Sequence, residues 1–192
     1  MNKISPWRIL ADHFSTLVDY PSVRVSPADI GFFFGLPLVG ASVVVWFNLN
    51  LKPEVLSGIL SAFSILGGLL LNLLVLVFSL TQSPQQDEAQ SVTDVNLIAR
   101  RHKLLREIHA NISFAILIAF ALVIVSTVAL WLIDSRATAD HPAITNSYYT
   151  FAIAFLALNF VLTVMMVLKR MHLLISGEFG MRKPTKLKRN AA

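Results

Sequence analysis

Four long hydrophobic stretches without a charged residue constrain the fold of this chain more than any other feature. Each exceeds the roughly 20 residues that an α-helix needs to cross a hydrocarbon core about 30 Å thick. Hydrophobic residues make up 55% of the chain and charged residues only 14%, which excludes a soluble globular domain. The sequence therefore predicts an all-α membrane protein, a bundle of four transmembrane helices. The stretches are Ile30 to Leu51, Val55 to Gln86, Ile108 to Ile133 and Pro142 to Leu168.

The positive charges predict how these helices are oriented. Three Lys or Arg residues precede the first span, four lie between the second and third, and seven follow the fourth. Lys52 and Arg136, in the two remaining connections, are the only others. By the positive-inside rule, this distribution places both termini and the middle connection in the cytoplasm.

Near the N-terminus, apolar residues recur at helical spacing on one face of a short segment that follows a Ser-Pro start signal. This segment predicts an amphipathic helix at the membrane interface or, with equal weight, a short helix packed against the protein itself. The apolar face consists of Trp7, Leu10, Phe14 and Leu17.

The remaining connections complete the predicted organisation. A short turn joins spans one and two, which should form a tight antiparallel hairpin. Gln85 to Ile133 contains neither Gly nor Pro, so one long helix could run from the cytoplasm through the third span, unless it restarts near Asp94. We expect a cytoplasmic amphipathic helix and linker at 1–29, transmembrane hairpins at 30–82 and 110–171, a long cytoplasmic helical arm at 83–109 and a basic cytoplasmic tail at 172–192.

The cytoplasmic arm is the predicted surface for a soluble partner. Its apolar residues follow a seam that continues through His102 and His109 toward the third span, and basic residues flank that seam. Exposed apolar surface of this kind usually marks an interaction site, and the flanking charges would steer an acidic partner. The predicted partner-binding residues are Val95, Ile98, Arg100, Arg101, Lys103, Leu105 and Arg106.

One face of the second span is small and polar, and the first span carries a Gly-xxx-Gly pair followed by Gly40 and Ala41. In lipid, such faces and interhelical hydrogen bonds usually mark helix contacts. The alternative is that several copies of this face line a hydrated passage through an oligomer. Two asparagines at matching depth could also link spans two and four, or two subunits. The predicted packing residues are Gly31, Gly35, Ser57, Ser61, Ser64, Gly68, Asn72 and Asn159.

The sequence contains little that could carry chemistry. No Asp, Glu, Lys or Arg lies inside a span, which argues against a coupled transporter. No Cys occurs, and the five His residues lack metal-ligand spacing, so we expect no catalytic residue, metal or cofactor. The basic residues flank the spans, where lipid headgroups account for them, so we expect membrane lipid contacts and no direct nucleic-acid binding. His102 and His109 are candidates for pH sensing.

In length and layout the chain resembles the KwaA family, the membrane subunits of bacterial Kiwa anti-phage defence systems. The similar passages are Ser26 to Pro37 and Asn96 to Ser113. The resemblance implies a homotetrameric sensor and scaffold of the bacterial inner membrane that detects envelope perturbation. It also implies a soluble, DNA-binding cytoplasmic partner resembling KwaB. A second resemblance, to four-span effectors that disrupt membranes, implies instead a depolarising pore.

Overall fold

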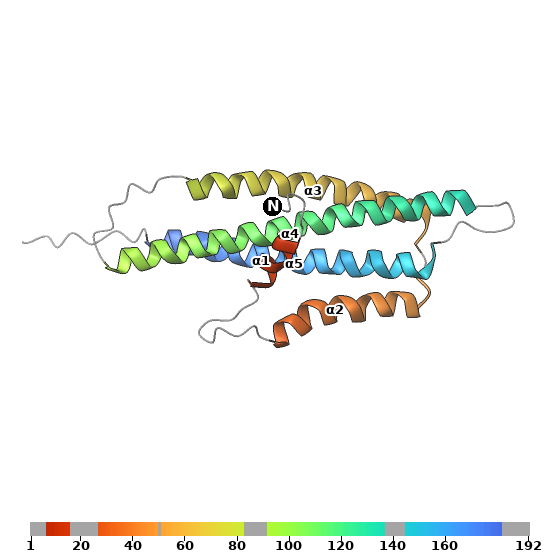
Figure 1. The fold of residues 1–192 in the computed structure, drawn as a ribbon, viewed down its shortest axis with the longest axis horizontal. Helices are drawn as coiled ribbons and strands as arrows, with labels where there is room; N and C mark the ends of the chain where they lie inside the picture. Colours follow the sequence, from red (N-terminus) through yellow and green to blue (C-terminus); the bar gives the residue numbers. More distant parts are fainter. Residues whose placement is uncertain (1–6, 16–26, 50, 83–91, 137–144, 182–192) are drawn as a thin grey trace, which may run out of the picture.

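The computed structural model describes residues 7–15, 27–49, 51–82, 92–136 and 145–181, and all regular structure in these ranges is α-helical (Figure 1). The helices are α1 (Trp7–Ser15), α2 (Pro27–Trp46), α3 (Pro53–Gln82), α4 (Val92–Arg136) and α5 (Ser147–Met181). Helices α2 and α3 each begin with a proline. Its fixed φ suits the first turn of a helix, where its missing N–H is not needed.

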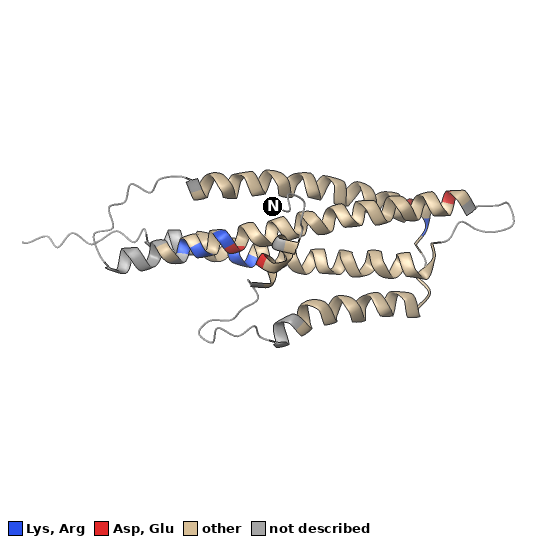
Figure 2. Ribbon diagram, in the orientation of Figure 1, with Lys and Arg blue, Asp and Glu red and all other residues tan. Residues whose placement is uncertain are grey.

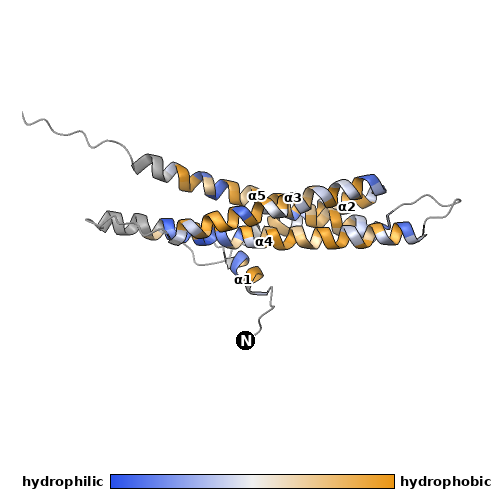
Figure 3. Cartoon of the chain, turned by 90° about the horizontal axis from the view of Figure 1, so that it is seen from above, coloured by the Kyte–Doolittle hydropathy of each residue, from blue (hydrophilic) through white to orange (hydrophobic). Residues whose placement is uncertain are grey.

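Three helices have the length and composition of membrane spans in the part of the chain that the structure describes. These spans are Pro53–Thr81, Arg101–Ser135 and Ser147–Ser176. The apolar part of α2, Gly31–Trp46, is shorter and covers about 24 Å at 1.5 Å per residue. Figure 3 shows hydrophobic residues along the middle of the long helices. The prediction of an all-helical membrane protein is confirmed, while the fourth span remains a prediction.

The four long helices pack in the order α3, α4, α5, α2, and each runs antiparallel to its neighbour (Figure 1). Helices α2 and α3 therefore lie on opposite sides of the α4–α5 pair and do not contact each other in the described residues. The predicted hairpin of spans one and two is wrong. Helix α3 also reaches α5, because the rings of Phe63 and Phe160 meet edge to face with centroids 5.0 Å apart.

The connection after α2 explains how consecutive helices become separated. Asn48 adopts a φ of 50°, a left-handed conformation that asparagine tolerates well. The amides of Asn48 and Leu49 then donate to the carbonyls of Val45 and Val44, which ends α2 in a Schellman motif. The Thr145 hydroxyl donates to the carbonyl of Leu51, which fastens this connection beside the start of α5.

Helix α4 contains 45 residues and is about 68 Å long, more than twice the thickness of a hydrocarbon core. It begins at Val92, close to the predicted restart, and residues 83–91 lie outside the described part of the chain. The Lys and Arg residues whose side chains the structure describes gather near the start of α4 and the end of α5, apart from Lys52 at the opposite end (Figure 2). The assignment of that basic end to the cytoplasm remains a prediction.

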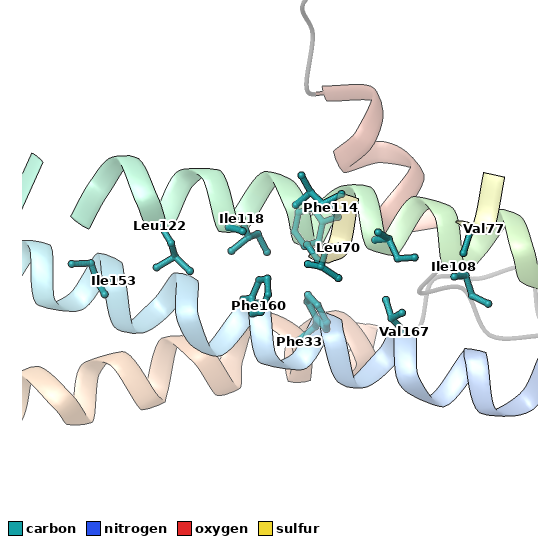
Figure 4. Close-up of a cluster of buried hydrophobic side chains, with 14 of the residues drawn as sticks. Phe33, Leu70, Val77, Ile108, Phe114, Ile118, Leu122, Ile153, Phe160 and Val167 are labelled. Atoms are coloured by element: carbon teal, nitrogen blue, oxygen red, sulfur yellow. The ribbon is translucent and has the colours of Figure 1, made fainter. Parts of the chain in front are cut away.

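Helix α4 also supplies the centre of the core. Its inward side chains recur at spacings of three and four, as expected for one face of a helix. Figure 4 shows Ile118 and Leu122 facing Phe160 and Ile153 of α5. The buried α4 residues in this core are Leu105, Ile108, Ile112, Phe114, Ala115, Ile116, Ile118, Ala119, Leu122, Ala129 and Ile133.

Candidate functional site at the junction of α1, α2 and α4

Helix α1 packs against α4 rather than standing apart from the bundle (Figure 1). Its inner side carries Ile9, Leu10, His13 and Phe14, whereas Trp7 is 75% exposed. Leu10 and Phe14 of the predicted apolar face therefore lie on the inner side, whereas the placement of Trp7 on that face is wrong and His13 takes part in it instead. Leu17, the last residue of the predicted face, lies outside the described residues.

His13 is the most deeply buried ionisable side chain of this junction, with an exposed fraction of 0%. Its ring stacks on Phe114 of α4 with centroids 3.9 Å apart and planes inclined by 16°. Phe33 of α2 lies 5.2 Å from the same ring. One imidazole on α1 thus contacts both the next helix, α2, and the distant α4.

A hydrogen bond fixes the orientation of the imidazole. His13 Nδ1 lies 2.7 Å from Asn111 Oδ1, and both residues are buried. Because an amide oxygen only accepts hydrogen bonds, Nδ1 carries the proton and donates. A neutral imidazole is sufficient for this bond, so the site does not require a charged histidine.

Burial is the main influence on the protonation of His13. Loss of hydration lowers the pKa of His13 from 6.5 to about 4, the Asn111 hydrogen bond opposes this shift, and the positive charge of Arg170 adds to it. Arg170 is itself paired with Glu107, with Nε and Oε2 3.6 Å apart. Glu107 also lies 3.9 Å from the Lys103 ammonium. The imidazole is therefore neutral at physiological pH and has a cation for a neighbour.

The predicted partner surface on α4 is only partly available. Leu105 is 2% exposed and belongs to the core, so its placement on an exposed seam is wrong. Lys103 and Arg106 are exposed, and Arg101 is half-buried. His102 and His109 are also exposed, which separates them from the core seam. The side chains of Val95, Ile98 and Arg100 lie outside the described part of the chain.

The small polar face of α3 points away from the chain's own helices. A Cβ added at Gly68 would meet nothing within 4 Å, and the same holds for Gly31 and Gly35 on α2. The close helix approaches occur at other glycines. A Cβ at Gly40 would lie 2.5 Å from Leu158 Cδ1, and one at Gly67 would lie 3.6 Å from the Ala119 Cβ. The exposed α3 residues of this face are Ser57, Ser61, Ser64, Gly68, Asn72 and Ser79.

Asn72 and Asn159 do not pair within one chain. Asn159 is buried in the bundle, whereas Asn72 is exposed on the outer face of α3. The Asn159 Oδ1, Ser126 Oγ and Thr150 Oγ1 atoms are buried without a hydrogen-bond partner in the described part of the chain. The predicted link between spans two and four is therefore wrong for a single chain, and a link between subunits remains a prediction.

A shallow hollow adjoins the small face of α3 at its boundary with α4. Its volume is about 230 Å³, and Ser64 and Gly68 form part of its wall. The opposite wall comes from Ala119, Phe120 and Val123 of α4. The outer surface therefore combines small side chains with a depression into which a larger side chain of a neighbouring helix could fit.

Sequence reasoning missed His13, because a single histidine among apolar residues carries no motif. Its position at i+4 from Ile9 was the available signal, since that spacing places it on the inner face.

Within the described residues, no three His, Asp or Glu side chains are placed to hold a metal ion. No family model, curated protein or solved structure matches this chain.

Proposed function

We propose that this protein is a non-enzymatic membrane scaffold and sensor that self-associates through the outer face of α3. The single observation that carries the proposal is the exposure of that polar face on a helix with the composition of a membrane span. Lipid does not drive helices together by hydrophobic burial, so small surfaces and interhelical hydrogen bonds supply the contact. A surface of this kind suits association more than catalysis.

Asn72 favours self-association more than any other residue of this face. The serines of the face already satisfy their hydroxyls: Ser61 and Ser64, for example, donate to the carbonyls of Ser57 and Leu60. The Asn72 amide makes no such bond within the described part of the chain. An amide left without partners in hydrocarbon costs several kcal/mol. Pairing with a second copy would relieve that cost, and the hollow beside Gly68 would accept a side chain of the same neighbour.

The decisive experiment compares three single substitutions on α3 in cross-linking and native mass spectrometry. Asn72→Leu and Gly68→Leu should lower the oligomer fraction, which we expect to have a mass near four times the 21.2 kDa of one chain. Gly58→Leu is the matched control, because a Cβ at Gly58 also meets nothing within 4 Å. That residue lies about 80° around the helix from Gly68. An oligomer fraction that is unchanged in all three variants would remove α3 from the interface.

The sensing role in anti-phage defence rests on the resemblance in layout to Kiwa membrane subunits. We assign partner binding to the basic end of α4, where exposed Lys103 and Arg106 suit an acidic surface on a soluble protein (Figure 2). The partner should be a DNA-binding protein of the KwaB type. Phage plating should then fall in cells that express both proteins and remain high in cells that express either one alone.

Charge reversal tests the assigned surface separately. The double substitution Lys103→Glu with Arg106→Glu should abolish co-purification of a co-expressed KwaB-type protein in mild detergent. Lys52→Glu is the control, since Lys52 is exposed at the opposite end of the bundle. Retention of the partner at wild-type levels by the double variant would contradict this assignment.

The second candidate is a depolarising pore, and the same outward face of α3 favours it. Several copies of that face around a common axis would present hydroxyl and amide groups to a hydrated passage. A potential-sensitive dye in cells that express this chain alone separates the two functions. A scaffold should leave the membrane potential intact, whereas a pore should collapse it.

A further inference from the structure

We infer that α1 is a pH-released latch, held against α2 and α4 by the neutral imidazole of His13 and freed when that imidazole takes up a proton. This release takes place within one chain. It goes beyond the proposed function and depends neither on the oligomer nor on a partner.

Helix α1 depends on docking for its structure. It contains nine residues, and isolated helices shorter than about 12 residues are marginal in water. Its inner contacts come from few side chains, of which His13 is fully buried and Ile9, Leu10 and Phe14 are partly buried. A change at His13 therefore acts on a large share of what holds the helix.

The pocket around His13 suits a neutral imidazole and not a charged one. Phe114 and Phe33 face the imidazole, and Asn111 accepts its Nδ1 proton. Protonation would place a second proton on Nε2 and a full charge inside this largely aromatic enclosure. Desolvating an uncompensated charge is far costlier than desolvating a neutral ring. Docking of α1 therefore favours the neutral form of the His13 imidazole.

The charged groups around the pocket add to this preference. On α4, Glu107 is engaged by Lys103 and by Arg170 of α5. The Arg170 charge repels an imidazolium at His13. On α1 the neighbouring Asp12 is exposed and already takes part in another interaction, and the described side chains of α2 carry no charge. Among the described side chains of α4 and α5, the surroundings thus supply one repelling cation and a carboxylate that already has partners.

The pH dependence follows by linkage. Above pH 6.5 the imidazole is neutral in both the docked and the released states, so docking is at full strength. Below pH 6.5 the released His13 binds a proton, whereas docking lowers the pKa of His13 to about 4. The ratio of docked to released α1 should therefore fall about tenfold per pH unit between these values. The fall would be roughly 150-fold at pH 4 and would approach roughly 300-fold at lower pH.

Spin-label distances measure this equilibrium without a pH-sensitive readout. The chain has no Cys, so Ala11→Cys and Ser135→Cys would carry the only labels. Ala11 is on the exposed side of α1, and Ser135 is exposed about 36 Å along α4 from Asn111. Docked α1 should give one narrow distance distribution in lipid nanodiscs, and released α1 a broad one. Leu10→Ala weakens docking without altering His13 and keeps both states measurable.

Histidine substitutions identify the responsible group. In the Leu10→Ala background, replacing His102, His109, His141 and His172 by Gln leaves His13 as the only histidine of five. The fall between pH 7.5 and 5.0 should persist in that variant and disappear in His13→Gln. A ratio that changes less than about twofold in the variant that retains only His13 would overturn the latch. The same fall in His13→Gln would overturn it too.

Discussion

The two polar regions of this protein are opposites in pattern and in placement. The outer face of α3 carries six small or polar residues at regular spacing, and the chain leaves them exposed. The junction of α1, α2 and α4 contains His13 and Asn111, which form no pattern in the sequence, and the chain buries both. Periodicity thus marks where a helix presents a surface, and it does not tell whether that surface meets the same chain, another chain or lipid.

The largest expected change in the free energy of unfolding is at Leu105, and it tests whether this residue belongs to the interior. Leu105→Asp would bury a carboxylate in the core and should lower the free energy of unfolding by about 4 kcal/mol or more. Arg106→Asp, at the exposed neighbouring position, should change it by less than about 0.5 kcal/mol. Unfolding by SDS titration in mixed micelles measures both. Equal stability of the two variants would mean that Leu105 is exposed and not part of the core.

A somewhat smaller effect is expected at the junction itself. Phe114→Ala removes the ring that stacks on His13 and should cost about 3 kcal/mol, with release of α1 as part of that loss. Phe120→Ala is the control, because Phe120 lies on the same helix and is exposed. The same unfolding titration, combined with the α1 distance measurement, separates lost core packing from lost docking. If the Phe114 variant kept wild-type stability and a docked α1, the Phe114 ring would not be what holds α1 at the junction.

The smallest expected change in stability is on the outer face of α3. Ser61→Ala removes a hydroxyl whose only role in the described structure is a bond to the Ser57 carbonyl of its own helix. The stability of the monomer should therefore change by less than about 0.5 kcal/mol. Thermal unfolding at a detergent concentration that keeps the chain monomeric is the measurement. A loss above about 1 kcal/mol would mean that this face packs within the chain.

The predictions from sequence succeeded where a property is local and failed where it depends on a partner. The long uninterrupted α4 was anticipated, because residues 85–133 contain neither Gly nor Pro. The hairpin of α2 and α3 was wrong because the length of a connection does not fix its direction. Thr145, about a hundred residues along the chain, holds that connection beside α5 through the Leu51 carbonyl. For the same reason, Gly40 and Gly67 pack closely while Gly31 and Gly35 do not.

The sequence by itself determined that this chain forms apolar helices of membrane-spanning length. In lipid, every backbone N–H and C=O must be satisfied within its own segment, so hydropathy and segment length are enough for that conclusion. Only the tertiary structure decided which helices are neighbours and which side of each faces inward. The bond between His13 and Asn111 joins residues 98 positions apart. Such contacts depend on the packing of whole helices against one another, a property that no single stretch of residues contains.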